Sequence, residues 1–179
     1  MKTNIEIRSE VMNELKNSLL LASTNIAVDV ICGKVFLSGK VDCYRKKFEA
    51  AQRTRSMQDI KAVRNDLYVD LLADNKRTDA EIKNAITYIL QENSIIPGKK
   101  ISFSVYDDGI VVLTGDAENN VQKYTIMNAV IDVPGIVNVW DFIKVKKFVI
   151  NDKEKNIVGR NKYQVIETSE IPAEDLVMV

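Results

Sequence analysis

The stretch Gly33–Gly39, which reads GKVFLSG, returns 76 residues later as GIVVLTG at Gly109–Gly115. In both places a valine-containing apolar run lies between two glycines, which is typical of a β-strand that follows a turn. The spacing is longer than the repeats of about 20–50 residues that build solenoid proteins. The sequence therefore predicts that one small folded module has been duplicated.

A helix is predicted before the first of these stretches. Val11, Leu15 and Leu19 recur every four residues and would share one face of that helix, with Ser9 as its cap. In the second copy the equivalent apolar face is assigned to Ile82, Ile86 and Leu90.

A β-hairpin and a second helix complete the module. Residues 26–30 alternate with period two and lead through a turn at Gly33 into a strand at 35–41. A helix at 44–57 and a strand at 66–71 follow. One helix face carries Tyr44, Phe48, Ala51 and Arg55, and its apolar part is expected to pack on the sheet.

The second copy repeats these steps. Strands are predicted at 101–105 and 110–115, a helix at 121–131 and a last strand at 140–145. Three residues of this helix are expected to point inward: Tyr124, Met127 and Ile131. Ile126 and Val130 widen its apolar face, which indicates either a broader core contact or a contact between modules or between chains.

These elements predict an α+β fold of two tandem α-β-β-α-β modules, each with two helices packed on a three-stranded sheet whose strand order stays open. The first module spans 5–72 and the second 77–146, joined by a short polar linker. Residues 147–179 fit neither copy and are interpreted as a C-terminal extension, either a partly ordered hairpin or a flexible end.

Composition and motifs argue against several classes of protein. Lys and Arg total 25, as do Asp and Glu, so a general nucleic-acid binder with a strong basic excess is not expected. The chain has no histidine, which removes the residue best suited to acid–base catalysis near neutral pH. Neither a phosphate-binding glycine loop nor a C-x-x-C spacing occurs, so we expect no catalytic residues, no cofactor and no metal site.

The two cysteines are expected to be free thiols. Cys32 and Cys43 lie at opposite ends of one predicted strand, roughly 20 Å apart at about 3.3 Å per residue, which is too far for a disulfide. No apolar run is long enough for a membrane span and no secretory signal is visible, so the expected location is cytoplasmic.

The order of these features resembles the BON domain, the bacterial OsmY and nodulation module. The resemblance rests on the I-x-V-x-V strand, the glycine turn, the V-x-L-S/T-G strand and the G-[IV]-x-x-V segment before the last strand, seen in both copies over residues 5–146. The first copy departs from the pattern at Asp59, where the second has Gly135; aspartate tolerates left-handed backbone better than most residues.

This resemblance implies a non-catalytic binding protein of osmotic or envelope stress, for which attachment to phospholipid is the usual proposed role. Some members of the family bind potassium, and no catalytic residues can be carried over from it. The implied partners are an anionic phospholipid surface or another protein, and the oligomeric state is left open.

Two candidate binding sites follow from the residues themselves. Arg45, Lys46 and Arg53 fall within an arc of about 100° on the second helix, either as a basic strip for anionic lipid or as an ordinary solvated face. Asp107 and Asp108 could offer oxygen ligands to a cation, or could simply form the hairpin turn. Five glycines are assigned to structural turns: Gly33, Gly39, Gly109, Gly115 and Gly135.

The leading prediction is thus a non-enzymatic protein that attaches to a membrane surface or to another protein. A small-cation sensor, with potassium or calcium held by turn carbonyls, is the first alternative. A structural scaffold that brings protein partners together is the second, and enzymatic activity ranks last.

Overall fold

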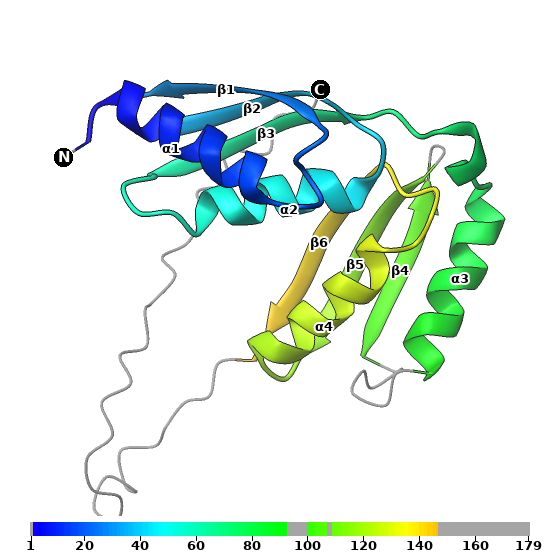
Figure 1. Ribbon diagram of the computed structural model, residues 1–179. Coiled ribbons are helices and arrows are strands. Elements are labelled where there is room, and N and C mark those ends of the chain that lie inside the picture. Colours follow the sequence, from blue (N-terminus) through cyan, green and yellow to red (C-terminus); the bar gives the residue numbers. More distant parts are fainter. Residues whose placement is uncertain (1, 93–99, 107–108, 147–179) are drawn as a thin grey trace, which may run out of the picture. The chain divides into compact units, whose positions relative to one another are not determined.

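A computed structural model describes residues 2–92, 100–106 and 109–146. The predicted C-terminal extension lies outside these residues. The described residues belong to one compact unit, Met1–Lys147. Its elements are α1 (Asn4–Asn17), β1 (Asn25–Ile31), β2 (Lys34–Val41), α2 (Tyr44–Arg55), β3 (Ala62–Val69), the short 3-10 helix η1 (Ala73–Asn75), α3 (Asp79–Glu92), β4 (Ile101–Tyr106), β5 (Ile110–Ala117), α4 (Asn120–Ile131) and β6 (Asn138–Val145) (Figure 1).

The fold class is confirmed: each copy is an α-β-β-α-β module with its own three-stranded sheet. The strand orders are β1-β2-β3 and β4-β5-β6, which the sequence left open. The hairpin strands pair antiparallel, whereas the third strand lies parallel to the second. Parallel pairing is possible because a whole helix crosses over between those two strands.

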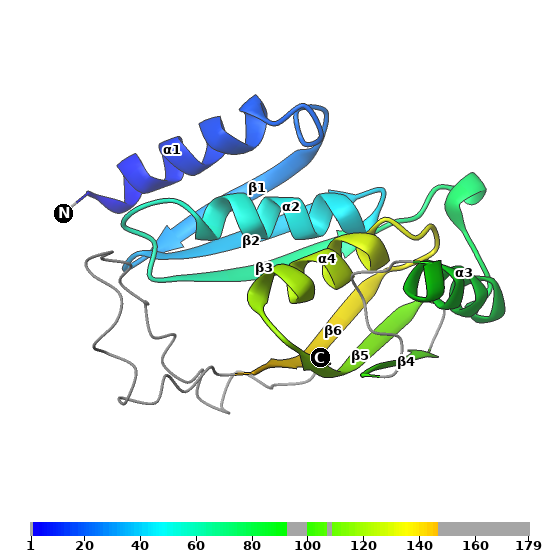
Figure 2. The ribbon, with the colours of Figure 1, turned by 90° about the horizontal axis from the view of Figure 1, so that it is seen from below.

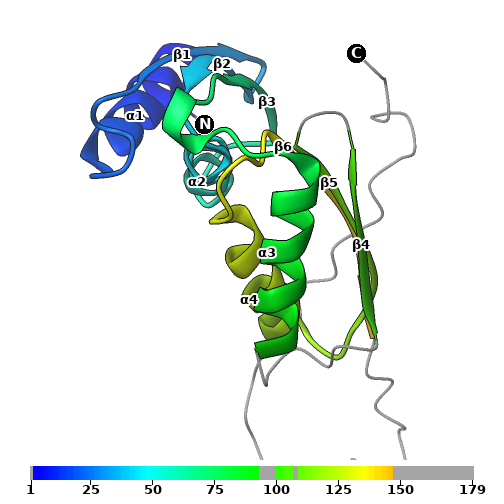
Figure 3. The ribbon, with the colours of Figure 1, turned by 90° about the vertical axis from the view of Figure 1, so that its right-hand side faces the viewer.

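Both helices of each copy cover the same face of their sheet. In the first copy α1 packs on β1, and α2 packs on β2 and β3 (Figure 2). In the second copy α3 and α4 lie on one side of the β4-β5-β6 sheet (Figure 3). The covered faces are lined by fully buried residues such as Val35 and Leu37 in β2 and Val111 and Leu113 in β5. The buried residues of the two copies belong to one connected cluster.

The first helix begins earlier than the sequence predicted. Thr3, not Ser9, is its cap: the Thr3 hydroxyl accepts from the Glu6 amide at 3.3 Å, and the Glu6 carboxylate accepts from the Thr3 amide at 2.7 Å. Thr78 and Glu81 make the same reciprocal pair at the start of α3, at 3.3 Å and 2.8 Å. This capping box satisfies two backbone amides that the first helical turn leaves unpaired.

The inward face of α1 shifts accordingly by one turn. Its buried residues are Ile7, Val11 and Leu15, which correspond at an offset of 75 to Ile82, Ile86 and Leu90. Leu19, predicted to continue this face, lies beyond the helix and is 99% exposed.

The offset between copies changes from 75 to 76 at the hairpin. The first hairpin turn has only Cys32 and Gly33, with φ of 51° and 80°, whereas three residues separate β4 from β5. Two successive residues with positive φ are what a tight hairpin turn requires. All five glycines singled out by sequence have positive φ, as does Asp59 at 68°.

The last glycine of each V-x-L-S/T-G stretch is required by a close approach between strands. Gly39 has φ of 124°, and a Cβ there would lie 2.6 Å from the carbonyl oxygen of Asn25. Gly115 has φ of 131° and lies against the carbonyl oxygen of Lys100 in the same way. A side chain at either position would therefore push the hairpin strands apart.

One expectation about inward side chains in α4 is wrong, and the broader core contact expected of Ile126 and Val130 is confirmed. Tyr124 is 56% exposed rather than inward, while Met127 and Ile131 are buried as predicted. Ile126 and Val130 are completely buried within the chain, so they offer no surface to another chain. The helix α4 contacts α3, β5 and β6 of its own copy and also α2 of the first copy. Its apolar face is wide because it packs against neighbours on several sides.

Candidate functional site

Tyr44 and Arg45 at the start of α2 connect the two copies. The Tyr44 hydroxyl donates to the carbonyl oxygen of Val139 at 3.4 Å, and the side chain is 8% exposed. Burial raises the pKa of Tyr44 to about 12. Next to it, the Arg45 guanidinium pairs with the carboxylate of Asp132 at 3.2 Å. Sequence predicted that Tyr44 points inward, but not that it reaches the other copy.

The three basic residues proposed for lipid contact do not form one free strip. Arg53 donates to the carboxylates of Glu14 at 2.9 Å and Glu49 at 2.7 Å, which raises the pKa of Arg53. Lys46 pairs with Asp42 at 2.8 Å and is only 14% exposed. Together with the Arg45–Asp132 pair, these contacts place a carboxylate beside every cation of the predicted strip.

Arg45 and Arg53 nevertheless share a surface with Leu19, which the sequence assigned to a helix, and with the neighbouring Leu20. The loop after α1 and the exposed side of α2 line a hollow of about 450 Å³, with Leu19, Leu20, Arg45, Glu49 and Arg53 around it. We call Leu19, Leu20, Arg45 and Arg53 the leucine–arginine site. An exposed apolar loop beside guanidinium groups is a combination suited to the interface of a membrane.

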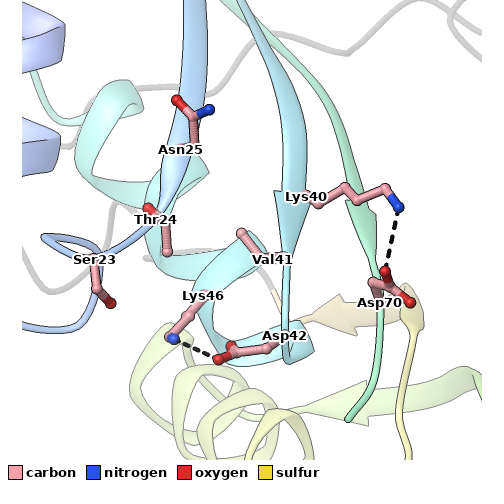
Figure 4. A pocket seen from close by; sticks show the side chains of 8 residues that line it. All are labelled: Ser23, Thr24, Asn25, Lys40, Val41, Asp42, Lys46 and Asp70. Atoms are coloured by element: carbon pink, nitrogen blue, oxygen red, sulfur yellow. Dashed lines mark hydrogen bonds and ion pairs between the residues drawn. The ribbon is translucent and has the colours of Figure 1, made fainter.

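Lys46 lies at a different place, in a polar pocket of about 270 Å³ at the start of α2 (Figure 4). Two ion pairs occupy it: Lys46 with Asp42, and Lys40 with Asp70 at 3.3 Å. The hydrogen bond from Lys46 lowers the pKa of Asp42, although one buried oxygen of that carboxylate has no hydrogen-bond partner among the described residues. With its cations and carboxylates paired, the pocket carries no net charge with which to select a ligand.

The cation site proposed at Asp107 and Asp108 lies outside the described residues. Among the residues that are described, no group of three or more Asp, Glu or Cys side chains could hold a metal ion. Both cysteines are free, Cys32 exposed in the hairpin turn and Cys43 half-buried before α2, where burial raises its pKa.

The outer face of the second sheet is a further surface, which the sequence analysis did not identify. It is the side of β4-β5-β6 opposite to α3 and α4 (Figure 3). Three half-exposed aromatic side chains lie on it: Tyr106 (53%), Trp140 (52%) and Phe142 (49%). Ile110 and Val112 complete what we call the aromatic face. Neighbouring strands bring them together, since Tyr106 is opposite Ile110, and Val112 is opposite Trp140.

The same face of the first sheet is charged. The positions of Ile110, Trp140 and Phe142 are taken there by Lys34, Arg64 and Asp66. Arg64 and Asp66 pair at 2.9 Å. Lys40 and Tyr68 also lie on this face, with the ammonium 5.8 Å from the ring centre. The two copies thus share a fold and an inner face but differ in their outer face.

The comparisons with known proteins identify the family to which these two modules belong. The BON domain family matches residues 5–70 and 78–147, so the chain belongs to this family and carries two tandem copies of its domain. Members of this family are generally binding proteins rather than enzymes. No curated protein matches the chain.

The solved structures with a partial likeness to the fold include two of one protein. One is the C-terminal domain of CdsD, the structural protein of the type III secretion system of Chlamydia trachomatis, with 14% identity and a TM-score of 0.34 over 82% of this chain and 100% of that one. The other, also of CdsD from Chlamydia trachomatis, has 14% identity and a TM-score of 0.29 over 76% of this chain and 92% of that one.

No helix among the described residues combines the length and the apolar character needed to cross a bilayer.

Proposed function

We propose that the protein is a non-catalytic attachment protein that binds the surface of a phospholipid membrane through the leucine–arginine site. The observation that carries this proposal is the full exposure of Leu19, at 99%, in a loop that lines the same hollow as Arg45 and Arg53. A setting in osmotic or envelope stress is part of the proposal and rests on the family resemblance.

Apolar transfer contributes most of the expected binding. Moving a leucine side chain out of water contributes about 1.5–3 kcal/mol, and each arginine near an anionic bilayer adds about 1 kcal/mol. For Leu19 and the two arginines the sum is about 3.5–5 kcal/mol, which corresponds to a dissociation constant between about 3 mM and 0.2 mM.

The ion pairs of the two arginines weaken this attachment without preventing it. Exposed pairs contribute only about 0–1 kcal/mol each, so Arg53 can exchange Glu49 for a lipid phosphate at small cost. The carboxylates stay close, however, and repel an anionic surface. We therefore expect attachment that is reversible and weakened by salt.

Co-sedimentation with lipid vesicles tests the proposal. At low salt the full chain should bind phosphatidylglycerol vesicles more than phosphatidylcholine vesicles, and raising the salt should release most of it. L19S/L20S should lose at least about five-fold in binding, because it removes the apolar part of the site. I5S is the matched control, since Ile5 is also strongly exposed, at 81%, but lies at the other end of α1.

R45Q/R53Q should bind phosphatidylglycerol vesicles no better than phosphatidylcholine vesicles, because the attractive charges are lost while the neighbouring carboxylates remain. Equal and negligible binding of the unmodified protein to both kinds of vesicle would overturn the proposal. So would binding that L19S/L20S and I5S reduce to the same extent.

A further inference from the structure

The aromatic face of the second sheet has no partner among the described residues, although its side chains are as apolar as those of a buried sheet face. Both of its layers of side chains are apolar: Val111, Leu113 and Ile143 point to the helices, while Val112, Trp140 and Phe142 point away from them. A sheet that is apolar on both faces normally has a second layer on each of them. The surface is therefore suited to a flat protein surface about 10 Å away, as in a two-sheet sandwich.

The chain's own first sheet cannot supply that layer. Beside Phe36 and Tyr68 its outer face carries four charged residues, Lys34, Lys40, Arg64 and Asp66, and burying these charges against aromatic rings would require their desolvation. Among the sheet faces of the described residues, the one that matches the aromatic face in flatness and in polarity is the aromatic face itself, on a second molecule of the chain.

The charge of the aromatic face also favours pairing with an identical face. On the outer side of β5 and β6 the ionised residues are Asp116 and Lys144, which lie opposite each other in register at one end of the sheet. The face is therefore neutral, and two identical faces do not repel each other. A surface for an acidic or basic partner would carry an excess of the opposite charge.

We propose that the aromatic face pairs with the same face of a second copy of this chain. The contact is isologous: Trp140 and Phe142 of each protomer pack on the partner's aromatic face across a two-fold axis. Serine and threonine residues at Ser102, Ser104 and Thr114 lie beside the rings and leave room for them.

The size of the face sets the strength of the dimer. Three strands of about eight residues cover roughly 14 Å by 26 Å, or about 370 Å² for each protomer. Stable interfaces bury about 800 Å² for each partner, so the dimer is weak and reversible.

Sedimentation equilibrium of the full chain between about 10 µM and 1 mM is the test, with fluorescence read on the same samples. Trp140 is the single tryptophan, so emission reports this face alone. The average mass should rise toward that of a dimer, and the emission should shift to shorter wavelength over the same concentrations.

The variant I110K/F142D should stay monomeric, with emission independent of concentration. It places on the second sheet the residues that the first copy has at the same positions, and it keeps Trp140. F142T is a milder version in case the double variant is unstable. F36T, which alters the outer face of the first sheet, is the matched control and should dimerise like the unmodified protein.

Four results would overturn the proposal, three of them in the protein alone and one with lipid. The first is a monomer with solvent-like Trp140 emission at every concentration. The second is a monomer whose emission is already shifted when dilute, because the face would then be covered within the same chain. The third is a dimer that I110K/F142D leaves intact. A shift on adding vesicles to dilute protein would assign the face to lipid and also overturn it, whereas the loss of binding in L19S/L20S tests the leucine–arginine site independently.

Discussion

Replacing Tyr44 by phenylalanine tests whether the two copies are joined as the structure describes. The change removes only the hydroxyl that donates to the Val139 carbonyl and keeps the buried ring. A hydrogen bond of this kind contributes about 0.5–1.5 kcal/mol to the free energy of unfolding, so Y44F should be destabilised by about that amount at neutral pH.

The effect of pH makes the prediction sharper. The pKa of Tyr44 is raised from 10.0 to about 12 in the folded protein, because burial disfavours the phenolate. Below pH 10 both states are neutral and the residue adds no pH dependence. Above pH 10 only the unfolded chain ionises, so the free energy of unfolding falls by about 1.4 kcal/mol for each pH unit until pH 12. Y44F has no hydroxyl to ionise and lacks this loss.

Urea unfolding of both proteins at pH 8 and pH 11, followed by circular dichroism, measures the difference directly. Tyr44 should make the unmodified protein lose about 1.4 kcal/mol more than Y44F between these two pH values. Other tyrosines and lysines cancel in the comparison. A difference between the two proteins that does not change with pH would refute the burial of Tyr44 against the second copy.

Three further substitutions test the local geometry. G115A should cost at least about 2 kcal/mol in urea unfolding, since φ of 131° and contact with the Lys100 carbonyl leave no room for a methyl group; an unchanged midpoint would contradict the close approach. T78A removes the capping box of α3 and should lower stability by about 1 kcal/mol in thermal unfolding, with T87A, which alters an exposed hydroxyl inside the same helix, as the control. D59G should raise stability by up to about 1 kcal/mol, because φ of 68° favours glycine; a loss of stability would show that the aspartate makes a contact that matters more.

Much of the fold was predictable because local patterns determine it. The period-two strands and their glycines predicted both hairpins, and the third strand followed from its place after a helix. Both ends of α1 were missed, because four-residue spacing alone does not show where a helix begins or ends. Leu19 continues the spacing, yet the helix ends at Asn17 and Leu21 turns into the core instead. The T-x-x-E signal of the capping box at Thr3 was the better guide.

Contacts between residues that are distant in the chain could not be predicted from the sequence. The period of α2 placed Tyr44 on its inner side but could not show that its partner belongs to the other copy. Arg45 and Asp132 are 87 residues apart, and no local rule pairs them. The aromatic face could have been found from alternation, since Trp140 and Phe142 must point away from Val139 and Ile143. Alternation alone does not show that both rings are exposed, because this depends on which face of the sheet the helices cover.

The protein is proposed to attach to a phospholipid surface through the leucine–arginine site of its first copy. Amide chemical-shift changes of the isotope-labelled chain, recorded while nanodiscs of phosphatidylglycerol are added, would test it residue by residue. Signals of residues 18–21, Arg45 and Arg53 should shift or broaden first, and those of β4, β5 and β6 should stay in place. Changes confined to the aromatic face, or none at any nanodisc concentration, would contradict it.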